Sequence, residues 1–298
     1  MHHFKNTLLR IKILFIINPI SGGLNKTFIP SLIDQYLDHQ KFDADIIYSE
    51  YHGHAAEIAN KAIISGVEII AAVGGDGTIN EIASEVSSLG KIMAIIPCGS
   101  GNGLARTLKI PLSHAKAIAR INAFNTVKVD VGTFNGKKFF NMAGMGFDAH
   151  ISFLFAKSTG RGLMGYVKSI FREIANYKAD HYIIEIDGKK IEREAFMLSI
   201  ANSSQYGNNA HISPEASLMD GLLDVCVIKP FPLWKFPVLG FRMFAKSTPY
   251  SKYVEIFKGK YIVIQRKKEG PIHLDGEPFM MEAKLTIEVA HLALELIV

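Results

Sequence analysis

The sequence predicts an N-terminal α/β domain, with a parallel sheet between two helical layers, followed by a mostly β domain. Three observations predict this fold class. Strand-like and helix-like segments alternate over roughly the first 130 residues. The run at 68–73 is almost wholly apolar, as a strand buried on both faces of a parallel sheet requires. After about Val127, β-rich runs are separated by Asn-Gly and Asp-Gly pairs, which are typical of hairpin turns.

The elements of the first half follow from the spacing of apolar residues. Phe28, Leu32, Ile33, Tyr36 and Leu37 share one face of a helix. The expected helices cover residues 28–37, 54–65, 78–87 and 113–122. The expected strands cover residues 12–17, 44–48, 68–73 and 91–96. Such alternation implies a parallel sheet with helices on both of its faces.

The second half is expected to contain strands at 137–140, 182–186, 195–200, 222–228 and 261–265. Asn135-Gly136 and Asp187-Gly188 are hairpin signals, and Lys258-Gly259 marks a further turn. One segment, 163–178, has helical spacing instead. Because the class of structure changes near Val127, we expect one domain over residues 1–130 and a second over 131–286.

The composition is that of a globular protein with a mild basic excess. Of the 298 residues, 48% are hydrophobic and 20% are charged, and the formal net charge is +5. These values argue against long disordered stretches. The positive charge fits an anionic partner, such as nucleotide phosphate or an acidic membrane surface, and fits a merely soluble basic protein equally well. We expect no nucleic-acid partner.

The two cysteines, Cys98 and Cys226, show neither disulfide nor zinc spacing, so a reducing cytoplasm is the expected compartment. Lys12 interrupts the apolar N-terminal run, and no small-residue cleavage site follows it. We therefore interpret this run as the first buried strand and not as a signal peptide. No apolar run approaches the ~18 residues that a membrane-spanning helix needs.

The sharpest chemical signal is Gly74-Gly75-Asp76-Gly77-Thr78, which joins a buried strand to a helix. Glycines let backbone N–H groups approach phosphate oxygens, and the positive end of the following helix points to the same place. A carboxylate beside phosphates is explained if Asp76 holds Mg²⁺ or accepts a proton. The alternative is a tight strand–helix turn with a capping Asp, and this motif alone leaves both interpretations open.

Two more glycine-rich loops follow predicted strands. Asn18-Pro19-Ile20-Ser21-Gly22-Gly23 follows the first strand, and Pro97-Cys98-Gly99-Ser100-Gly101-Asn102-Gly103 follows the strand at 91–96. Because loops at the carboxyl ends of parallel strands meet in one crevice, three of them make a nucleotide site the leading explanation. Neither a Walker A loop nor a dinucleotide fingerprint is present, so a Rossmann dehydrogenase is a poor alternative.

These three loops resemble the diacylglycerol kinase catalytic family, which also holds sphingosine kinases and bacterial lipid kinases. The resemblance continues into the second half and spans roughly the whole chain. Its segments there are Asn141-Met142-Ala143-Gly144-Met145-Gly146-Phe147-Asp148, Pro214-Glu215-Ala216 with Asp220-Gly221-Leu222-Leu223-Asp224-Val225, and Leu274-Asp275-Gly276-Glu277-Pro278.

The resemblance implies a nucleotide-binding α/β domain and an antiparallel β-sandwich domain, with the active site in the cleft between them. It implies that the final strand, over 287–298, returns to the first domain. The implied cofactors are ATP and Mg²⁺. Ser49 and Ser100 stand where the family more often has threonine, and both keep the hydroxyl group. The implied ATP contacts are Asn18, Ser21, Gly22, Ser49, Gly74, Gly75, Gly77, Thr78, Asn80, Glu81, Gly99, Ser100 and Asn102.

The same resemblance implies three catalytic carboxylates: Asp76, Asp275 and Glu277. Asp275 or Glu277 would act as general base, because a lipid hydroxyl is a poor nucleophile at neutral pH. Asp220, with the backbone carbonyls of Ser217 and Leu222, resembles a structural Mg²⁺ site. For both Asp-Gly motifs the alternative is an ordinary turn.

We therefore predict a lipid kinase that transfers the γ-phosphate of ATP to a hydroxyl of a diacylglycerol-like or sphingoid lipid. The alternatives are an enzyme like NAD kinase or phosphofructokinase with a soluble acceptor, and a non-catalytic nucleotide-binding regulator. The segment 231–244 mixes aromatic and basic residues, which predicts either contact with a membrane interface or a helix packed on the sandwich. We expect a cytoplasmic protein that transiently contacts the inner face of the membrane. The sequence does not decide between a monomer and a homodimer.

Overall fold

The computed structural model describes residues 10–23, 25–157, 173–174 and 176–298. The chain forms two compact units. Unit 1 contains the residues up to Ser100, Lys109–Val127 and Leu294–Val298, and unit 2 contains Gly101–Leu108 and Lys128–Ala293. The change of unit after Val127 lies close to the expected boundary at residue 130. Residues 101–108 lie in unit 2, whereas the sequence placed them in the first domain.

Unit 1 is built on a parallel sheet with the strand order β2-β1-β3-β4. The strands are β1 (Ile11–Ile17), β2 (Phe42–Tyr48), β3 (Ile69–Gly74) and β4 (Ile92–Pro97). Glu295 and Leu296, near the end of β16 (Lys284–Ile297), pair parallel to β4. Every residue of β3 is buried, which explains its apolar sequence.

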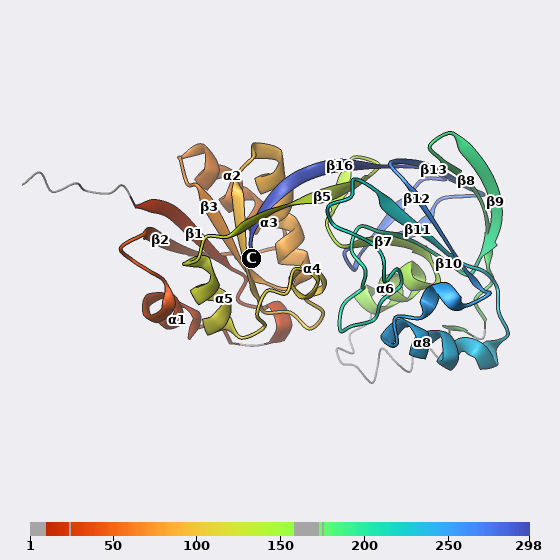
Figure 1. Ribbon diagram of the computed structural model, residues 1–298, viewed down its shortest axis with the longest axis horizontal. Coiled ribbons are helices and arrows are strands. Elements are labelled where there is room, and N and C mark those ends of the chain that lie inside the picture. The colour runs from red at the N-terminus through yellow and green to blue at the C-terminus, as the bar shows by residue number, and fades with distance from the viewer. Residues whose placement is uncertain (1–9, 24, 158–172, 175) are drawn as a thin grey trace, which may run out of the picture. The chain divides into compact units, whose positions relative to one another are not determined.

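Two pairs of helices cover this sheet. α1 (Ile29–Tyr36) packs against α5 (His114–Ile121), and α5 contacts β4. α2 (His54–Ile64) packs against α3 (Asp76–Leu89), which contacts β3. Figure 1 shows the two pairs on opposite faces of the sheet, which is the predicted arrangement.

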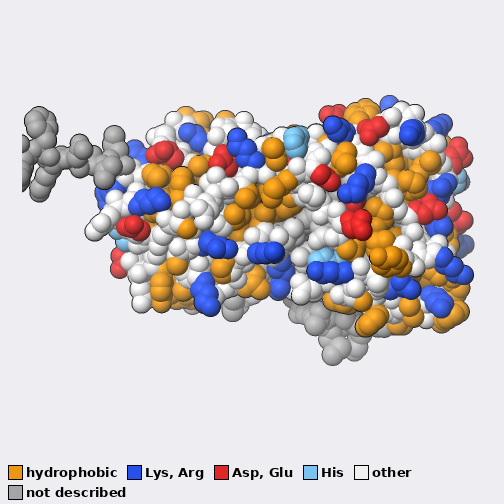
Figure 2. Space-filling model, viewed as in Figure 1, with side chains coloured by type: hydrophobic (Ala, Val, Ile, Leu, Met, Phe, Trp, Pro, Cys, Tyr) orange, Lys and Arg blue, Asp and Glu red, His pale blue; other side chains and the backbone are white. Residues whose placement is uncertain are grey.

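Basic side chains lie on the visible surface of both units (Figure 2).

Unit 2 contains two sheets. The first is antiparallel throughout, in the order β12-β11-β10-β7-β14-β15. Its strands are β12 (Val254–Gly259), β11 (Leu223–Ile228), β10 (Met197–Ala201), β7 (Met142–Gly146), β14 (Gly270–Leu274) and β15 (Glu277–Met281). The second sheet contains the first part of β16 with β13 (Tyr261–Arg266), β8 (Asp180–Ile186), β9 (Lys189–Ala195), β5 (Thr126–Phe134) and β6 (Lys137–Phe139).

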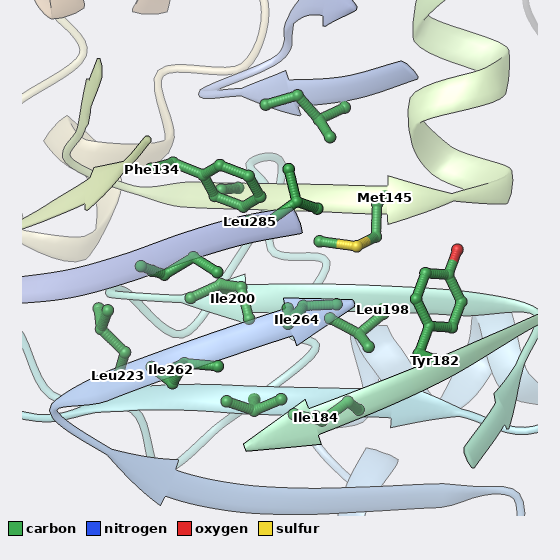
Figure 3. Packing of buried hydrophobic residues seen from close by; sticks show 14 of the residues in the cluster. Phe134, Met145, Tyr182, Ile184, Leu198, Ile200, Leu223, Ile262, Ile264 and Leu285 are labelled. Carbon is green, nitrogen blue, oxygen red and sulfur yellow. The ribbon is translucent and has the colours of Figure 1, made fainter. Parts of the chain in front are cut away.

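The core of unit 2 lies between these sheets, as in a β-sandwich (Figure 3). Met145, Leu198, Ile200 and Leu223 come from the first sheet. The second sheet contributes Phe134, Tyr182, Ile184, Ile262, Ile264 and Leu285. Each of these side chains is almost fully buried, and burying one of this size contributes about 1.5–3 kcal/mol.

The hairpin signals act as predicted in two places. Asn135 and Gly136 have φ of 46° and 79° between β5 and β6, and Asp187 and Gly188 have φ of 48° and 82° between β8 and β9. Such positive values are those of a type I′ hairpin turn. Lys258-Gly259 is different. It ends β12, and the next strand, β13, belongs to the other sheet, so the chain changes sheets there.

Helical segments lie outside the two sheets of unit 2. They are α4 (Gly103–Thr107), α6 (Phe147–Lys157), η2 (Leu233–Lys235), α8 (Phe236–Phe244) and η3 (Thr248–Tyr250). Most of the helix expected at 163–178 falls outside the described residues. Within the part of the chain that the structure describes, no helix has both the length and the apolar character needed to cross a membrane.

Candidate active site

Three loops meet at the carboxyl ends of the strands of unit 1. The loop after β1 is fixed by Asn18, whose backbone N–H donates to the Val73 carbonyl at 3.0 Å. Asn18 Nδ2 also donates to Thr78 Oγ1 at 2.9 Å. The loop after β4 is fixed to β3, because Cys98 N donates to the Gly74 carbonyl at 2.7 Å. The structure thus brings together the three glycine-rich segments.

The glycines of these loops allow backbone to meet backbone. Gly22 has φ +65°, and a Cβ built on it would lie 2.1 Å from the Cys98 carbonyl oxygen. A Cβ on Gly75 would lie 3.3 Å from Gly99 Cα. Gly74 is needed for a different reason, since its Cβ would lie 2.5 Å from Thr78 Cβ. A side chain at Gly22 would therefore push the loops after β1 and β4 apart, and one at Gly74 would displace the Thr78 side chain.

Helix α3 begins inside the glycine motif. Its first residue is Asp76 and its N-cap is Gly75, without any side-chain cap. Asp76 is therefore the first helical residue and not the N-cap residue. A negative charge in the first turn is stabilised by the helix dipole, and the same N-terminus favours an anionic ligand. Asp76, Gly77 and Asn80 are half-buried, whereas Thr78 is buried.

Ser49 and Glu81 hold the loop after β2 beside α3. Ser49 is buried, and its N–H donates to the Ile17 carbonyl at 2.9 Å. Glu81 Oε1 accepts a hydrogen bond from Gly53 N at 3.1 Å and lies 2.9 Å from His52 Nδ1. These contacts give Glu81 a clear structural role in unit 1.

Lys26 is a residue of this region that sequence reasoning missed. Its side chain is buried, and its ammonium group donates to the Ser21 carbonyl. Ser21 Oγ in turn donates to the Asn18 carbonyl at 3.3 Å. Burial lowers the pKa of Lys26 and raises the pKa of the nearby Cys98 thiol to about 11. Lys26 therefore stabilises the loop after β1 through the Ser21 carbonyl. The only sequence feature that could have indicated this role is a lysine a few residues beyond a Gly-Gly pair.

The end of the third loop belongs to unit 2. A Cβ on Gly103 would lie 2.5 Å from Asn141 Nδ2, so glycine is required there. Asn102 is buried with φ 51° and caps α4, where its carbonyl accepts from Arg106 N at 2.9 Å. Ser100, in unit 1, is exposed. The expected ATP contacts at 99–102 are therefore divided between the two units.

Asp275 lies in the turn between β14 and β15. Asp275 and Gly276 have φ of 49° and 91°, as in a type I′ turn. Asp275 Oδ1 accepts from Asn141 N and Met142 N, both at 2.8 Å, and Oδ2 accepts from Phe140 N at 2.9 Å. Both carboxylate oxygens are thus used to hold the segment 140–142.

Glu277 is in a different environment from Asp275. It begins β15, pairs with Leu274 across the hairpin and is half-buried. Beside this hairpin, His273 Nε2 lies 3.0 Å from Asp148 Oδ2, and Tyr206 OH donates to the same oxygen at 3.0 Å. Burial and the Asp148 carboxylate raise the pKa of Tyr206 well above its ordinary value. Nothing in the sequence spacing indicated this buried network.

The side chains of the loop around Asp220 make contacts of their own. Asp220 Oδ1 accepts from Leu222 N at 3.1 Å, and Ser217 Oγ accepts from Met219 N at 3.2 Å. Lys258 Nζ lies 3.4 Å from Asp220 Oδ2 and 3.3 Å from Asp224 Oδ1.

Lys258 therefore brings a positive charge to the position where the resemblance implied Mg²⁺. Burial lowers the pKa of Lys258, but the Asp224 and Asp220 carboxylates outweigh it and raise that pKa above its ordinary value. A divalent ion bound by Asp220 would compete with this ammonium group for the carboxylate. The ligand set of Ser217, Asp220 and Leu222 stays a prediction that this arrangement does not favour.

Comparison with protein families gives two matches along the chain. Residues 12–134 match the diacylglycerol kinase catalytic domain. Residues 141–298 match the YegS C-terminal NAD kinase beta sandwich-like domain. The two matches correspond approximately to the two units of the structure.

Individual proteins give a consistent picture. A protein of Pseudomonas aeruginosa (strain UCBPP-PA14), assigned as a YegS-like lipid kinase, is 30% identical over 231 residues, which cover 76% of this chain and 75% of that protein. The diacylglycerol kinase of Bacillus subtilis (strain 168) is 24% identical over 268 residues, or 88% of each chain. A crystal structure assigned as a diacylglycerol kinase from Bacillus anthracis str. Sterne has a TM-score of 0.79 and 27% identity, covering 96% of both chains.

Proposed function

Because this chain belongs to the YegS-like lipid kinases, which carry a diacylglycerol kinase catalytic domain, we propose that it transfers the γ-phosphate of ATP to a lipid hydroxyl. The acceptor is a diacylglycerol-like or sphingoid lipid. One observation carries the proposal. The loops after β1, β3 and β4 come so close that a Cβ on Gly22 would overlap the Cys98 carbonyl oxygen, and a Cβ on Gly75 would lie in tight contact with Gly99 Cα.

The triphosphate is held by backbone N–H groups of these loops and by the N-terminus of α3. Asp76 supplies one carboxylate there, and no group of three or more His, Cys, Asp or Glu among the described residues could hold a metal. A single carboxylate suits Mg²⁺ that is bound mainly by phosphate oxygens and water. Asp76 would hold this ion on the protein when ATP is bound, and the ion would supply positive charge against the phosphate oxygens.

Glu277 is the general base in this proposal. As the lipid oxygen bonds to the γ-phosphorus, the bond from that phosphorus to the bridging oxygen of ADP breaks, and Glu277 takes the hydroxyl proton. Asp275 is a positioning residue instead, because its two oxygens accept hydrogen bonds from the backbone of Phe140, Asn141 and Met142. The lipid acceptor brings the protein transiently to the inner face of the membrane.

The proposal is tested by incubating the purified protein and MgATP with separate acceptors. The lipid acceptors are diacylglycerol, a sphingoid base and phosphatidylglycerol, and the soluble acceptors are NAD and fructose 6-phosphate. We expect a phosphorylated lipid, and at least about 100-fold slower turnover in Asp76→Asn and Glu277→Gln, with both variants folded. Phosphorylation of NAD without any lipid product would favour the soluble-acceptor alternative. ATP binding without any product would favour the regulator.

A further inference from the structure

Unit 2 exposes an apolar surface around α8, which we call the α8 face. It consists of Leu233, Trp234, Val238, Phe241, Phe244 and Tyr250. Four of these side chains are large aromatic groups with high exposure: Trp234 at 69%, Phe241 at 71%, Phe244 at 61% and Tyr250 at 81%. Because a surface helix normally presents polar residues to water, this clustering requires an explanation other than folding.

The opposite side of α8 already accounts for its attachment to unit 2. Leu239 is buried, and Phe236 and Met243 are partly buried against a cluster that includes Phe196. Residues 236, 239 and 243 share one helical stripe, so Val238 and Phe241 point away from it. Phe231 also packs on the cluster, with its ring centroid 5.0 Å from that of Phe196. The helix is therefore apolar on both sides, and among the described residues only one of these sides packs against unit 2.

Within the segment that forms the α8 face, the charged residues are all basic. From Lys229 to Lys252 the sequence has no Asp or Glu, and its basic residues are Lys229, Lys235, Arg242, Lys246 and Lys252. Lys229 is paired with Glu255 at 3.0 Å. Lys235 Nζ lies 4.1 Å from the centre of the Trp234 ring. Figure 2 shows hydrophobic and basic side chains next to one another in the region of α8.

We propose that the α8 face is a membrane-docking surface that rests on a bilayer rich in anionic lipids. Aromatic rings favour the interface between water and hydrocarbon, and the basic residues around them favour anionic headgroups. The excess of basic residues in the segment 229–252 argues against a second copy of the same face, since two identical basic surfaces repel. The inference deepens the proposed function and rests on it only in that a lipid acceptor would lie in a bilayer.

Trp234 is the only tryptophan in the chain, so intrinsic tryptophan fluorescence reports on the α8 face alone. The full-length protein is mixed, without ATP, with vesicles of phosphatidylcholine or of phosphatidylcholine and phosphatidylglycerol. We expect a blue shift of the emission and co-sedimentation with the anionic vesicles only, weakened by salt. In Phe241→Ser/Phe244→Ser and in Lys235→Glu/Lys246→Glu, we expect binding to weaken at least about tenfold.

Matched controls lie elsewhere on the surface. Ile64→Ser removes an apolar side chain that is 74% exposed on α2, and Lys267→Glu/Lys268→Glu reverses two exposed charges between β13 and β14. Both should bind vesicles as the parent protein does. Melting temperature and turnover of a short-chain diacylglycerol in detergent micelles show that the α8-face variants are folded and active.

The proposal is overturned if emission from Trp234 does not shift with anionic vesicles. It is also overturned if the α8-face variants bind as well as the controls, or if the α8 face mediates dimerisation in sedimentation runs without lipid. A protein that binds vesicles through this face but phosphorylates no lipid keeps the docking surface and loses the proposed function. A protein that phosphorylates a short-chain lipid but does not bind vesicles keeps the proposed function and loses the docking surface.

Discussion

Asp275 accepts three backbone hydrogen bonds, so we expect its replacement to lower stability as well as turnover. Asn tolerates the positive φ of the turn, which means that Asp275→Asn removes the charge without disturbing the backbone. Hydrogen bonds to a charged group each contribute roughly 1.5–3 kcal/mol, and we expect a loss of about 1–3 kcal/mol in unfolding free energy. Chemical denaturation measures this loss.

Glu277→Gln is the matched control for Asp275→Asn, because it changes the other carboxylate of the same hairpin. It should lower the unfolding free energy less than Asp275→Asn does, because Asp275 accepts three backbone hydrogen bonds, while turnover falls. Equal stability losses in both variants would contradict the division of roles. The sequence indicated both residues as base candidates. It could not separate them, because the separation depends on the amides of Phe140, Asn141 and Met142, which are remote in sequence.

At the scale of the elements, the loops after β1 and β4 depend on each other through Gly22. Gly22 and Gly23 have almost the same φ, +65° and +68°, but only Gly22 faces a neighbouring backbone. Alanine at either position must adopt the left-handed conformation, which costs roughly 1–2 kcal/mol in free energy. Gly22→Ala additionally forces Cβ against the Cys98 carbonyl. We expect Gly22→Ala to weaken ATP binding much more than Gly23→Ala in isothermal titration calorimetry, and equal effects would refute the role of this contact.

The elements themselves were largely predictable, since apolar periodicity and buried runs depend on local sequence. The helix after Gly75 was expected from residue 78, but it begins at Asp76. Gly77 lies in this helix although glycine has a low helix propensity. Ile79, Ile82 and Val86 of the same helix are buried, and their packing favours the helical conformation. The hairpins at Asn135-Gly136 and Asp187-Gly188 were predictable because their turn type needs those residues.

At the scale of the whole molecule, the change from alternating elements to strands indicated two parts of the chain. It could not indicate that residues 101–108 join unit 2, because that depends on Gly103 lying against Asn141.

The loop around Asp220 also depends on a contact that is remote in sequence. Lys258 lies 38 residues beyond Asp220 in sequence, yet its ammonium group reaches that carboxylate at 3.4 Å. Motif resemblance alone gave no sign of this competing cation.

The central claim is that the protein moves the γ-phosphate of ATP onto a lipid. Its most direct test is incubation with [γ-³²P]ATP and a total lipid extract, followed by partition between organic and aqueous phases. We expect label in a phosphorylated lipid of the organic phase, and its loss in Glu277→Gln. Label confined to a water-soluble acceptor, or equal lipid labelling by Glu277→Gln, would contradict it.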